Sequence, residues 1–267
     1  MTALPDLRRE RERVCRLDPA AALESLADAE AFLRDRGMLT RLADCSLPSL
    51  FEACHEEPYK PGSRGFGLWP RTKWRWAFEL AERPRIHVLA VHRGKGLFVT
   101  VETAARVDPL AREELGRIED GALGPEAARV VSHLAAAGPS LLEDLREEIG
   151  VDARRLRPKL ERRAAVVARA VVRDEGNTSE LSRWDQVFGE PAGSGGLGDL
   201  LVAGVRAAVV APEDEVETWF SWRTPPALVD QLVDEGRLLR PEPGWISAAQ
   251  TSSPRAPERP GLSPRPA

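Results

Sequence analysis

Residues 125–173 most constrain the fold of this chain, because three helical segments and one extended segment follow one another there without a long break. Apolar residues recur at i, i+3, i+4 and i+7 within 126–137, which predicts an amphipathic helix. A Gly-Pro-Ser sequence at 138–140 ends this helix and caps a second one over 141–149. A third helical stretch follows Asp152 and runs through Arg163, divided or kinked at Pro158.

Residues 164–172 change the pattern, because β-branched valines alternate there with other residues and favour a strand. The order helix, helix, basic helix and strand is typical of a helix-turn-helix followed by a β wing. We therefore expect a winged helix in this segment and an α+β, mainly helical fold for the chain. A turn is predicted over 174–179, with structure resuming over 181–188.

The region before this segment has similar elements in a similar order. Helices are predicted after Asp18, closing at Gly37, and then over 49–56 and 73–82, the last with Thr72 as its cap and its tryptophans in the core. Strands over 86–92 and 97–102 flank a glycine-bearing turn, which predicts a hairpin with a cationic tip. Residues 107–124 are acidic and predict a helical connector.

The same pattern occurs a third time after a Gly/Ser-rich linker at 191–196. Helices are predicted over 200–210, from Pro212 and from Pro225, followed by a hairpin over 237–247. We therefore predict tandem winged helices, with these divisions: a charged lead at 1–17, a first unit at 18–107, a second with its connector at 108–190, a third at 197–248 and a disordered tail at 249–267. The lead is expected to be solvated, either without regular structure or as a frayed helix.

Charge is distributed unevenly along the chain, although the net charge is only −4. Residues 60–96 carry nine Lys or Arg against two Glu, and residues 151–173 carry eight against two acidic residues. Two basic regions on an acidic body indicate a phosphate-facing side. The cations expected to line one face on double-stranded DNA are Arg64, Lys73, Arg75, Arg93, Lys95, Arg154, Arg155, Arg157, Lys159, Arg162 and Arg163.

The three cysteines lack Cys-x-x-Cys spacing, which favours a reducing compartment and argues against a structural zinc. We expect no metal and no cofactor. No apolar run is long enough to span a bilayer, and the first residues lead into charges instead of a signal peptide. A cytoplasmic protein associated with the nucleoid is the resulting expectation.

Several short sequences in the chain resemble the AlkZ/YcaQ group of winged-helix DNA glycosylases, and most closely shorter, AlkZ-related actinobacterial proteins. They are Leu-Pro-Ser-Leu-Phe-Glu-Ala at 47–53, Lys-Trp-Arg-Trp at 73–76, His-Arg-Gly-Lys at 92–95, and the segment from Gly-Pro-Ser at 138–140 to Leu-Glu-Arg-Arg at 160–163. The resemblance extends over residues 18–247. It implies metal-free excision of alkylated or crosslinked purines from DNA that lies across a concave surface of three units.

The chain departs from that group at its catalytic motif, a Gln-x-Gln or Gln-x-Asp that places the attacking water. Its glutamines, Gln186, Gln231 and Gln250, do not begin such a motif, so no catalytic residue carries over. Hydrolysis of the glycosidic bond needs a carboxylate or amide to position water. Glu52 and His55, beside two more glutamates at 56–57, form the compact group that could replace the motif.

Three functions remain open from the sequence. The first is a DNA-binding protein in a DNA-repair context, the second an active DNA glycosylase, and the third a protein-interaction module. Salt dependence of binding separates DNA binding from a protein interface, and release of a free base identifies the enzyme.

Overall fold

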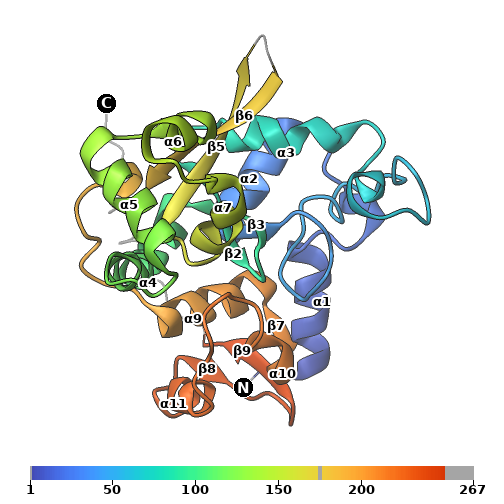
Figure 1. Cartoon of the computed structure of the whole chain (residues 1–267). Coiled ribbons are helices and arrows are strands. Elements are labelled where there is room, and N and C mark those ends of the chain that lie inside the picture. The colour runs from blue at the N-terminus through green and yellow to red at the C-terminus, as the bar shows by residue number, and fades with distance from the viewer. Residues whose placement is uncertain (1, 174–175, 250–267) are drawn as a thin grey trace, which may run out of the picture.

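The chain folds into a mixed α+β structure, described for residues 2–173 and 176–249 in a computed structural model, with side chains described for 2–171 and 178–249 (Figure 1). Strands within these ranges form three small antiparallel sheets. Their orders are β1-β3-β2, β4-β6-β5 and β7-β9-β8. In each sheet, the strand that comes first along the chain is followed by a hairpin. The second strand of that hairpin pairs with this first strand. The same topology therefore occurs three times along the chain.

The first sheet and its helices come from residues 26–100. The elements are α2 (Leu26–Arg36), β1 (Met38–Thr40), α3 (Trp76–Ala81), β2 (Ile86–His92) and β3 (Lys95–Thr100). A capping box between Ser25 and Asp28 starts α2, and Gly37 ends it with φ of 79°. Asp18 caps a 3-10 turn at Pro19–Ala21, as predicted, but the α-helix begins only at Leu26. Leu23 lies between the two in the core and donates its N–H to the Ala53 carbonyl.

The helix predicted over 49–56 is absent, and turns occupy these described residues. Thr40 N–H donates to the Pro48 carbonyl, and Leu50 N–H donates to the Thr40 carbonyl, both at 2.9 Å. These hydrogen bonds hold residues 48–50 against the end of β1. The segment therefore adopts turns, although its apolar spacing favours a helix. The helix predicted over 73–82 is a 3-10 turn at Lys73–Arg75 followed by α3, and the Thr72 side chain makes no cap bond.

Helix α4 (Val101–Glu119) is longer and more central than the predicted connector. It begins at Thr100, which caps it, so β3 ends two residues earlier than expected. Its buried face includes Val107, Ala111 and Ile118, and it contacts α5, α8 and α9. The first unit is thereby joined to both others.

The second sheet and its helices have the helices and the strand predicted over 125–173, in the predicted order. Its elements are α5 (Pro125–Ala137), β4 (Ser140–Leu141), α6 (Leu142–Ile149), α7 (Ala153–Arg162), β5 (Val166–Arg173), β6 (Gly176–Arg183) and α8 (Trp184–Phe188). Helix α7 continues through Pro158 instead of dividing there. The turn predicted over 174–179 is wrong for 176–179, which belong to β6, and residues 174–175 lie outside the described ranges. The β5–β6 hairpin projects from the body of the molecule (Figure 1).

The third sheet follows the linker. Its elements are α9 (Leu197–Ala208), β7 (Val210–Pro212), α10 (Glu213–Val216), α11 (Leu228–Asp234), β8 (Leu238–Leu239) and β9 (Trp245–Ala248). The helix predicted from Pro212 is one turn long, and the helix predicted from Pro225 begins at Leu228. The linker packs on α4, because Ala192 N–H donates to Asp108 at 3.0 Å. The tail prediction concerns residues that, apart from Ala249, lie outside the described ranges.

The largest apolar cluster joins the first and third units. Met38, Leu89 and Val99 from the first sheet pack there with Trp219 and Ile246 from the third unit. The second unit has a separate cluster around Leu134 and Leu145, and the first has another around Phe32 and Phe98. Burial of the apolar side chains in the largest cluster therefore holds the first and third units together.

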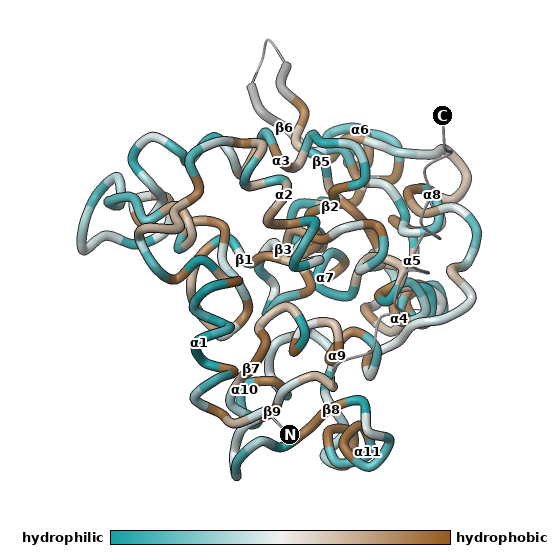
Figure 2. The backbone as a smooth tube through the Cα atoms, turned by 180° about the vertical axis from the view of Figure 1, so that it is seen from behind, coloured by the Kyte–Doolittle hydropathy of each residue, from teal (hydrophilic) through white to brown (hydrophobic). Residues whose placement is uncertain are grey.

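The charged lead is helix α1 (Leu4–Val14), and most of its residues are exposed. Most of it is hydrophilic (Figure 2), yet Leu4 and Cys15 at its two ends are buried. The Cys15 thiol lies 3.6 Å from the Ala207 carbonyl, and the Arg8 guanidinium lies 4.5 Å from the Trp245 ring centroid. The apolar ends dock α1 onto the third unit, while its charged face stays in water.

Candidate nucleic-acid interface

A cavity of about 350 Å³ opens between the loop after β1 and the β2–β3 hairpin. Its lining residues are Thr40, Arg41, Leu42, Asp44, Gly65, Trp69, His92, Gly94, Lys95 and Gly96. The hairpin places its positive-φ turn, Arg93 and Gly94, beside this cavity. We call it the Arg41 pocket.

Arg41 is a cation of this pocket whose side chain has no partner among the described residues. Its Nε atom is buried, and its guanidinium forms no hydrogen bond or ion pair with any described residue. The guanidinium carbon lies 4.7 Å from the Trp69 ring centroid and 5.9 Å from that of Phe98. Burial lowers the pKa of Arg41, because the charged form loses its hydration. A partly buried cation without a counter-ion loses part of its hydration, so the pocket favours an anionic ligand.

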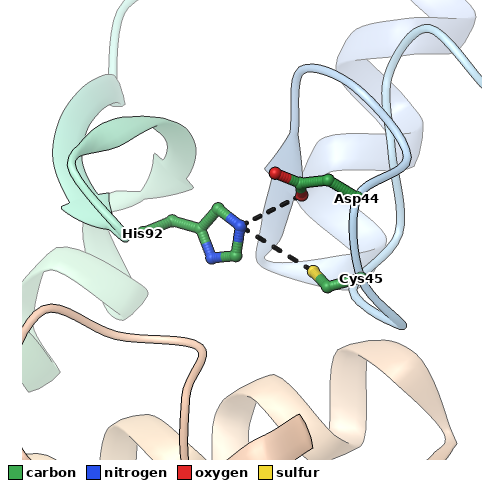
Figure 3. A group of neighbouring side chains, drawn as sticks. All are labelled: Asp44, Cys45 and His92. Atoms are coloured by element: carbon green, nitrogen blue, oxygen red, sulfur yellow. Dashed lines mark hydrogen bonds and ion pairs between the residues drawn. The ribbon is translucent and has the colours of Figure 1, made fainter.

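Asp44, Cys45 and His92 lie together at the pocket wall, the first two from the loop after β1 and His92 from β2 (Figure 3). The Nε2 of His92 is 3.1 Å from Asp44 Oδ1 and 3.9 Å from the Cys45 sulfur. The other ring nitrogen, Nδ1, is 2.7 Å from the Trp219 carbonyl oxygen. Lys95 forms an ion pair with the second oxygen of Asp44. The group thus connects the first unit to the third.

Burial and charge shift the acidity of these groups in different directions. Burial lowers the pKa of His92, although Asp44 opposes this shift. Burial raises the pKa of Asp44, but the bonds from Lys95 and His92 outweigh it and leave that pKa lowered. Burial raises the pKa of the Cys45 thiol to about 12. Asp44 is therefore ionised at neutral pH, and a cation next to it is stabilised.

The predicted cations of the first basic region do not all face solvent. Arg64 and Arg75 are exposed and form no ion pair with a described residue. Lys73 turns inward, and its ammonium donates to the Leu23 carbonyl at 2.7 Å. Arg93 donates to the Thr218 carbonyl at 3.0 Å, and Lys95 is paired with Asp44. Two of the five are therefore available to a ligand as they stand.

The predicted cations on and just after α7 are mostly paired with carboxylates. These pairs are Arg154–Glu143 at 2.6 Å, Arg155–Asp152 at 3.6 Å, Arg157–Glu161 at 2.9 Å and Arg163–Glu114 at 2.6 Å. Lys159 is exposed and forms no ion pair with a described residue. Arg162 donates to the Arg93 carbonyl at 3.1 Å, and α7 packs on β2. The two basic regions therefore meet at the hairpin, but with less free charge than the sequence indicates.

A chain of exposed aromatic side chains adjoins the Arg41 pocket. Tyr59, Phe66 and Phe78 are 61%, 47% and 49% exposed. Ring centroids lie 6.1 Å apart for Tyr59 and Phe66 and 4.8 Å apart for Phe66 and Trp69, and Trp69 lines the pocket. Trp74 lies 5.5 Å from Phe66 and is only partly buried, so the prediction that the tryptophans belong to the core is wrong for this residue.

Sequence reasoning missed this aromatic surface and the pocket beside it. Aromatic and cationic residues alternate in the Pro- and Gly-dense loop at 57–75, and that pattern is the signal that could have indicated it. We call the exposed residues Tyr59, Lys60, Arg64, Phe66, Arg71, Arg75 and Phe78 the basic-aromatic surface.

The catalytic candidates Glu52 and His55 lie away from the pocket lining. His55 adopts φ of 46°, and its Nε2 is 2.7 Å from the Arg16 carbonyl oxygen. The neighbouring Glu56 accepts from the N–H groups of Thr72 and Lys73 at 2.8 and 3.0 Å. His55 and Glu56 therefore hold loops in place, and the carboxylate that lines the pocket is Asp44.

No protein-family model, curated protein or solved structure matches this chain. The resemblance to winged-helix glycosylases therefore stays a prediction from the sequence. Among the described helices, none combines the length and apolar character needed to cross a membrane.

Proposed function

We propose that this protein binds DNA through tandem winged-helix units, with the Arg41 pocket accepting a phosphate of the bound strand. The observation that carries the proposal is the partly buried Arg41 side chain, whose guanidinium carbon lies 4.7 Å from the Trp69 ring centroid and which has no acidic partner among the described residues. A site of this kind gains free energy when an anion enters, because the anion supplies the missing charge and hydrogen-bond acceptors.

The repeated topology supports the winged-helix part of the proposal. Each unit has a helix, a short strand, a second segment that is helical in two of the three, a third helix and a hairpin. This is the order in which a helix-turn-helix carries a β wing. In the second unit, the wing would be the projecting β5–β6 hairpin, which follows the basic helix α7.

The basic-aromatic surface supports nucleic acid as the ligand. Cations along a surface attract the phosphate backbone, and exposed aromatic rings stack with unpaired bases. Tyr59 and Phe66 provide such rings next to Arg64, and Trp69 continues the series into the pocket. This combination favours DNA with an unstacked nucleotide over regular duplex, which agrees with the repair context and nucleoid location expected from the sequence.

The test compares Arg41→Gln with Arg34→Gln, which removes an exposed cation from α2. Binding of a labelled duplex, with and without an unpaired nucleotide, is measured by fluorescence anisotropy at two salt concentrations. We expect Arg41→Gln to weaken binding at least about tenfold, in line with a lost charge-assisted contact of about 1.5–3 kcal/mol. Arg34→Gln should bind like the wild type.

The thermal midpoint of unfolding of Arg41→Gln shows whether a loss of binding comes from a lost contact or from a lost fold. Arg41 is partly buried and has no acidic partner among the described residues, so Arg41→Gln relieves a desolvation cost and should keep or raise the midpoint. Loss of binding with an unchanged fold supports a phosphate site. Unchanged affinity in Arg41→Gln would show that the pocket takes no phosphate.

A protein-interaction module is the second candidate, and the exposed apolar side chains of Tyr59, Phe66, Leu68 and Phe78 favour it. Binding to DNA that falls steeply with salt supports the first proposal. DNA binding that is absent at low salt would favour the protein partner instead.

The glycosylase alternative requires a water-positioning group in the pocket, and Asp44 is the carboxylate among its lining residues. Lys95 already pairs with that carboxylate, which makes it a weaker base. Incubation with alkylated or crosslinked duplex, followed by mass spectrometry of the free bases, tests this alternative. Base release above the level of a protein-free control would establish the enzyme.

A further inference from the structure

We propose that Asp44, Cys45 and His92 form a metal site that takes zinc, with Oδ1, Sγ and Nε2 as its ligand atoms. One oxygen, one sulfur and one nitrogen ligand atom lie within 4.8 Å of one another, and Figure 3 shows all three side chains directed toward the same space. The sequence predicted no metal because the cysteines lack the usual spacing. The structure completes a ligand set by bringing His92 to two adjacent residues, Asp44 and Cys45, which lie 48 and 47 positions earlier.

The distances fit a tetrahedral zinc. Zinc lies about 2.0–2.3 Å from N, O and S ligands, so its ligand atoms stand roughly 3.3–3.6 Å apart. In the structure, His92 Nε2 is 3.1 Å from Asp44 Oδ1 and 3.9 Å from Cys45 Sγ. These two distances lie within about 0.3 Å of the tetrahedral values, and the ligand atoms of Asp44 and Cys45 lie within 4.8 Å of each other.

The hydrogen bonds of His92 also point to a cation at this position. Nδ1 faces the Trp219 carbonyl oxygen at 2.7 Å, and a carbonyl oxygen only accepts, so Nδ1 carries a proton. In a neutral ring, Nε2 then carries a lone pair and faces a carboxylate oxygen, another acceptor. A cation between these two acceptors relieves their repulsion. Donation of the second ring N–H to a backbone carbonyl is also the usual support of a metal-bound histidine.

The surroundings accommodate the ion in two further ways. Lys95 holds the second oxygen of Asp44, which leaves Oδ1 directed at His92 and orients the carboxylate. Asp44 and His92 line the Arg41 pocket, so a fourth ligand such as a water molecule would reach the ion from that pocket. Zinc binding displaces the proton of the Cys45 thiol, which passes to solvent as the sulfur–zinc bond forms.

The experiment uses the full chain, treated with a chelator and then titrated with cobalt(II) and with zinc. A sulfur-to-cobalt charge-transfer band with the intensity of tetrahedral cobalt, saturating at one ion per chain and removed by zinc, supports the site. Zinc should also raise the thermal midpoint, because it binds the folded state. Absence of the cobalt band in the wild-type chain would overturn the proposal and leave a protonated His92 between the two acceptors.

Matched variants assign the ligands. Cys45→Ser should weaken cobalt and zinc binding at least about 100-fold and abolish the charge-transfer band. Cys54→Ser removes another buried thiol, whose sulfur donates to the Leu50 carbonyl, and should leave both the metal affinity and the band unchanged. Asp44→Asn should keep the band and weaken affinity. Circular dichroism checks that each variant is folded, and a band that survives Cys45→Ser would overturn the assignment.

Discussion

The Nδ1 atom of His92 lies 2.7 Å from the backbone carbonyl oxygen of Trp219, although 127 residues separate the two along the chain. Next to this contact, the Arg93 guanidinium bonds both the carbonyl and the hydroxyl of Thr218. Trp219 is fully buried in the cluster shared by the first and third units. The position of His92 in the wall of the Arg41 pocket therefore depends on the third unit. Substitutions that disturb the packing of Trp219 should also alter the pocket.

Packing against Trp219 makes Gly204 of α9 intolerant of a side chain. A Cβ atom at this position would lie 2.9 Å from the indole ring. Alanine favours a helix by about 0.5–1 kcal/mol over glycine, but the clash in a packed core costs about 1–3 kcal/mol. Gly204→Ala should therefore lower the free energy of unfolding, measured by urea denaturation. Gly116→Ala in α4 is the control, since a Cβ there meets no atom within 4 Å, and it should be neutral or stabilising.

The core of the second unit depends on Leu145, which is fully buried in α6. Leu145→Asp combines loss of a buried leucine with burial of a charge, so it should destabilise the protein by at least about 4 kcal/mol. Circular dichroism during thermal unfolding measures the effect. Glu147→Asp, at an exposed position of the same helix, should stay within about 0.5 kcal/mol of the wild type. A folded Leu145→Asp protein with an unchanged midpoint would contradict the packing described for this unit.

Asp108 should make stability depend on acidic pH. Its carboxylate is buried and accepts from the Trp184 indole at 2.7 Å, from Arg112 and from the Ala192 N–H. Burial raises the pKa of Asp108, but these donors outweigh it and lower the pKa below its ordinary value. A lowered folded-state pKa gives stability that is present above the unfolded value of about 3.9 and is lost as pH falls through the folded value.

Asp108→Asn tests this dependence. The variant should be about 1–3 kcal/mol less stable at neutral pH, and its deficit should shrink as pH falls below about 4. Urea denaturation over a pH series measures both. Asp120→Asn, at the exposed end of α4, should leave the pH profile unchanged. A deficit that is constant across the whole series would show that ionisation of Asp108 does not contribute.

The basic-aromatic surface should determine the salt dependence of DNA binding. Arg64→Gln combined with Arg75→Gln removes two exposed cations, and each lost phosphate contact reduces the slope of log affinity against log salt by about 0.9. Arg9→Gln combined with Arg13→Gln removes the same charge from α1, where both arginines are paired with acidic neighbours. Only the first pair should weaken binding and flatten the slope. Equal effects of the two pairs would indicate nonspecific attraction by net charge.

The sequence by itself determined the elements whose residues make mainly local contacts. The apolar spacing of 126–137, the stop at Gly150 and the glycine turn between β2 and β3 predicted α5, α6 and the first hairpin, because helix periodicity and turn chemistry depend on neighbours in sequence. The mixed α+β class followed from the same patterns. Opposite charges three residues apart in α1 were also readable, but not the burial of Leu4 and Cys15 that docks this helix.

Only the tertiary structure decided what the polar residues do. Local pattern favoured a helix over 49–56, but hydrogen bonds to β1 hold that segment in turns. The sequence predicted cations near α7 that are free to bind phosphate. In the structure Arg163 pairs with Glu114, and Arg154 pairs with Glu143. In the sequence Arg41 is one arginine among many, and only the fold places it, partly buried, near Trp69 and Phe98 without an acidic partner among the described residues. Charge pairing and burial depend on which residues meet across the fold, and spacing along one chain does not contain that information.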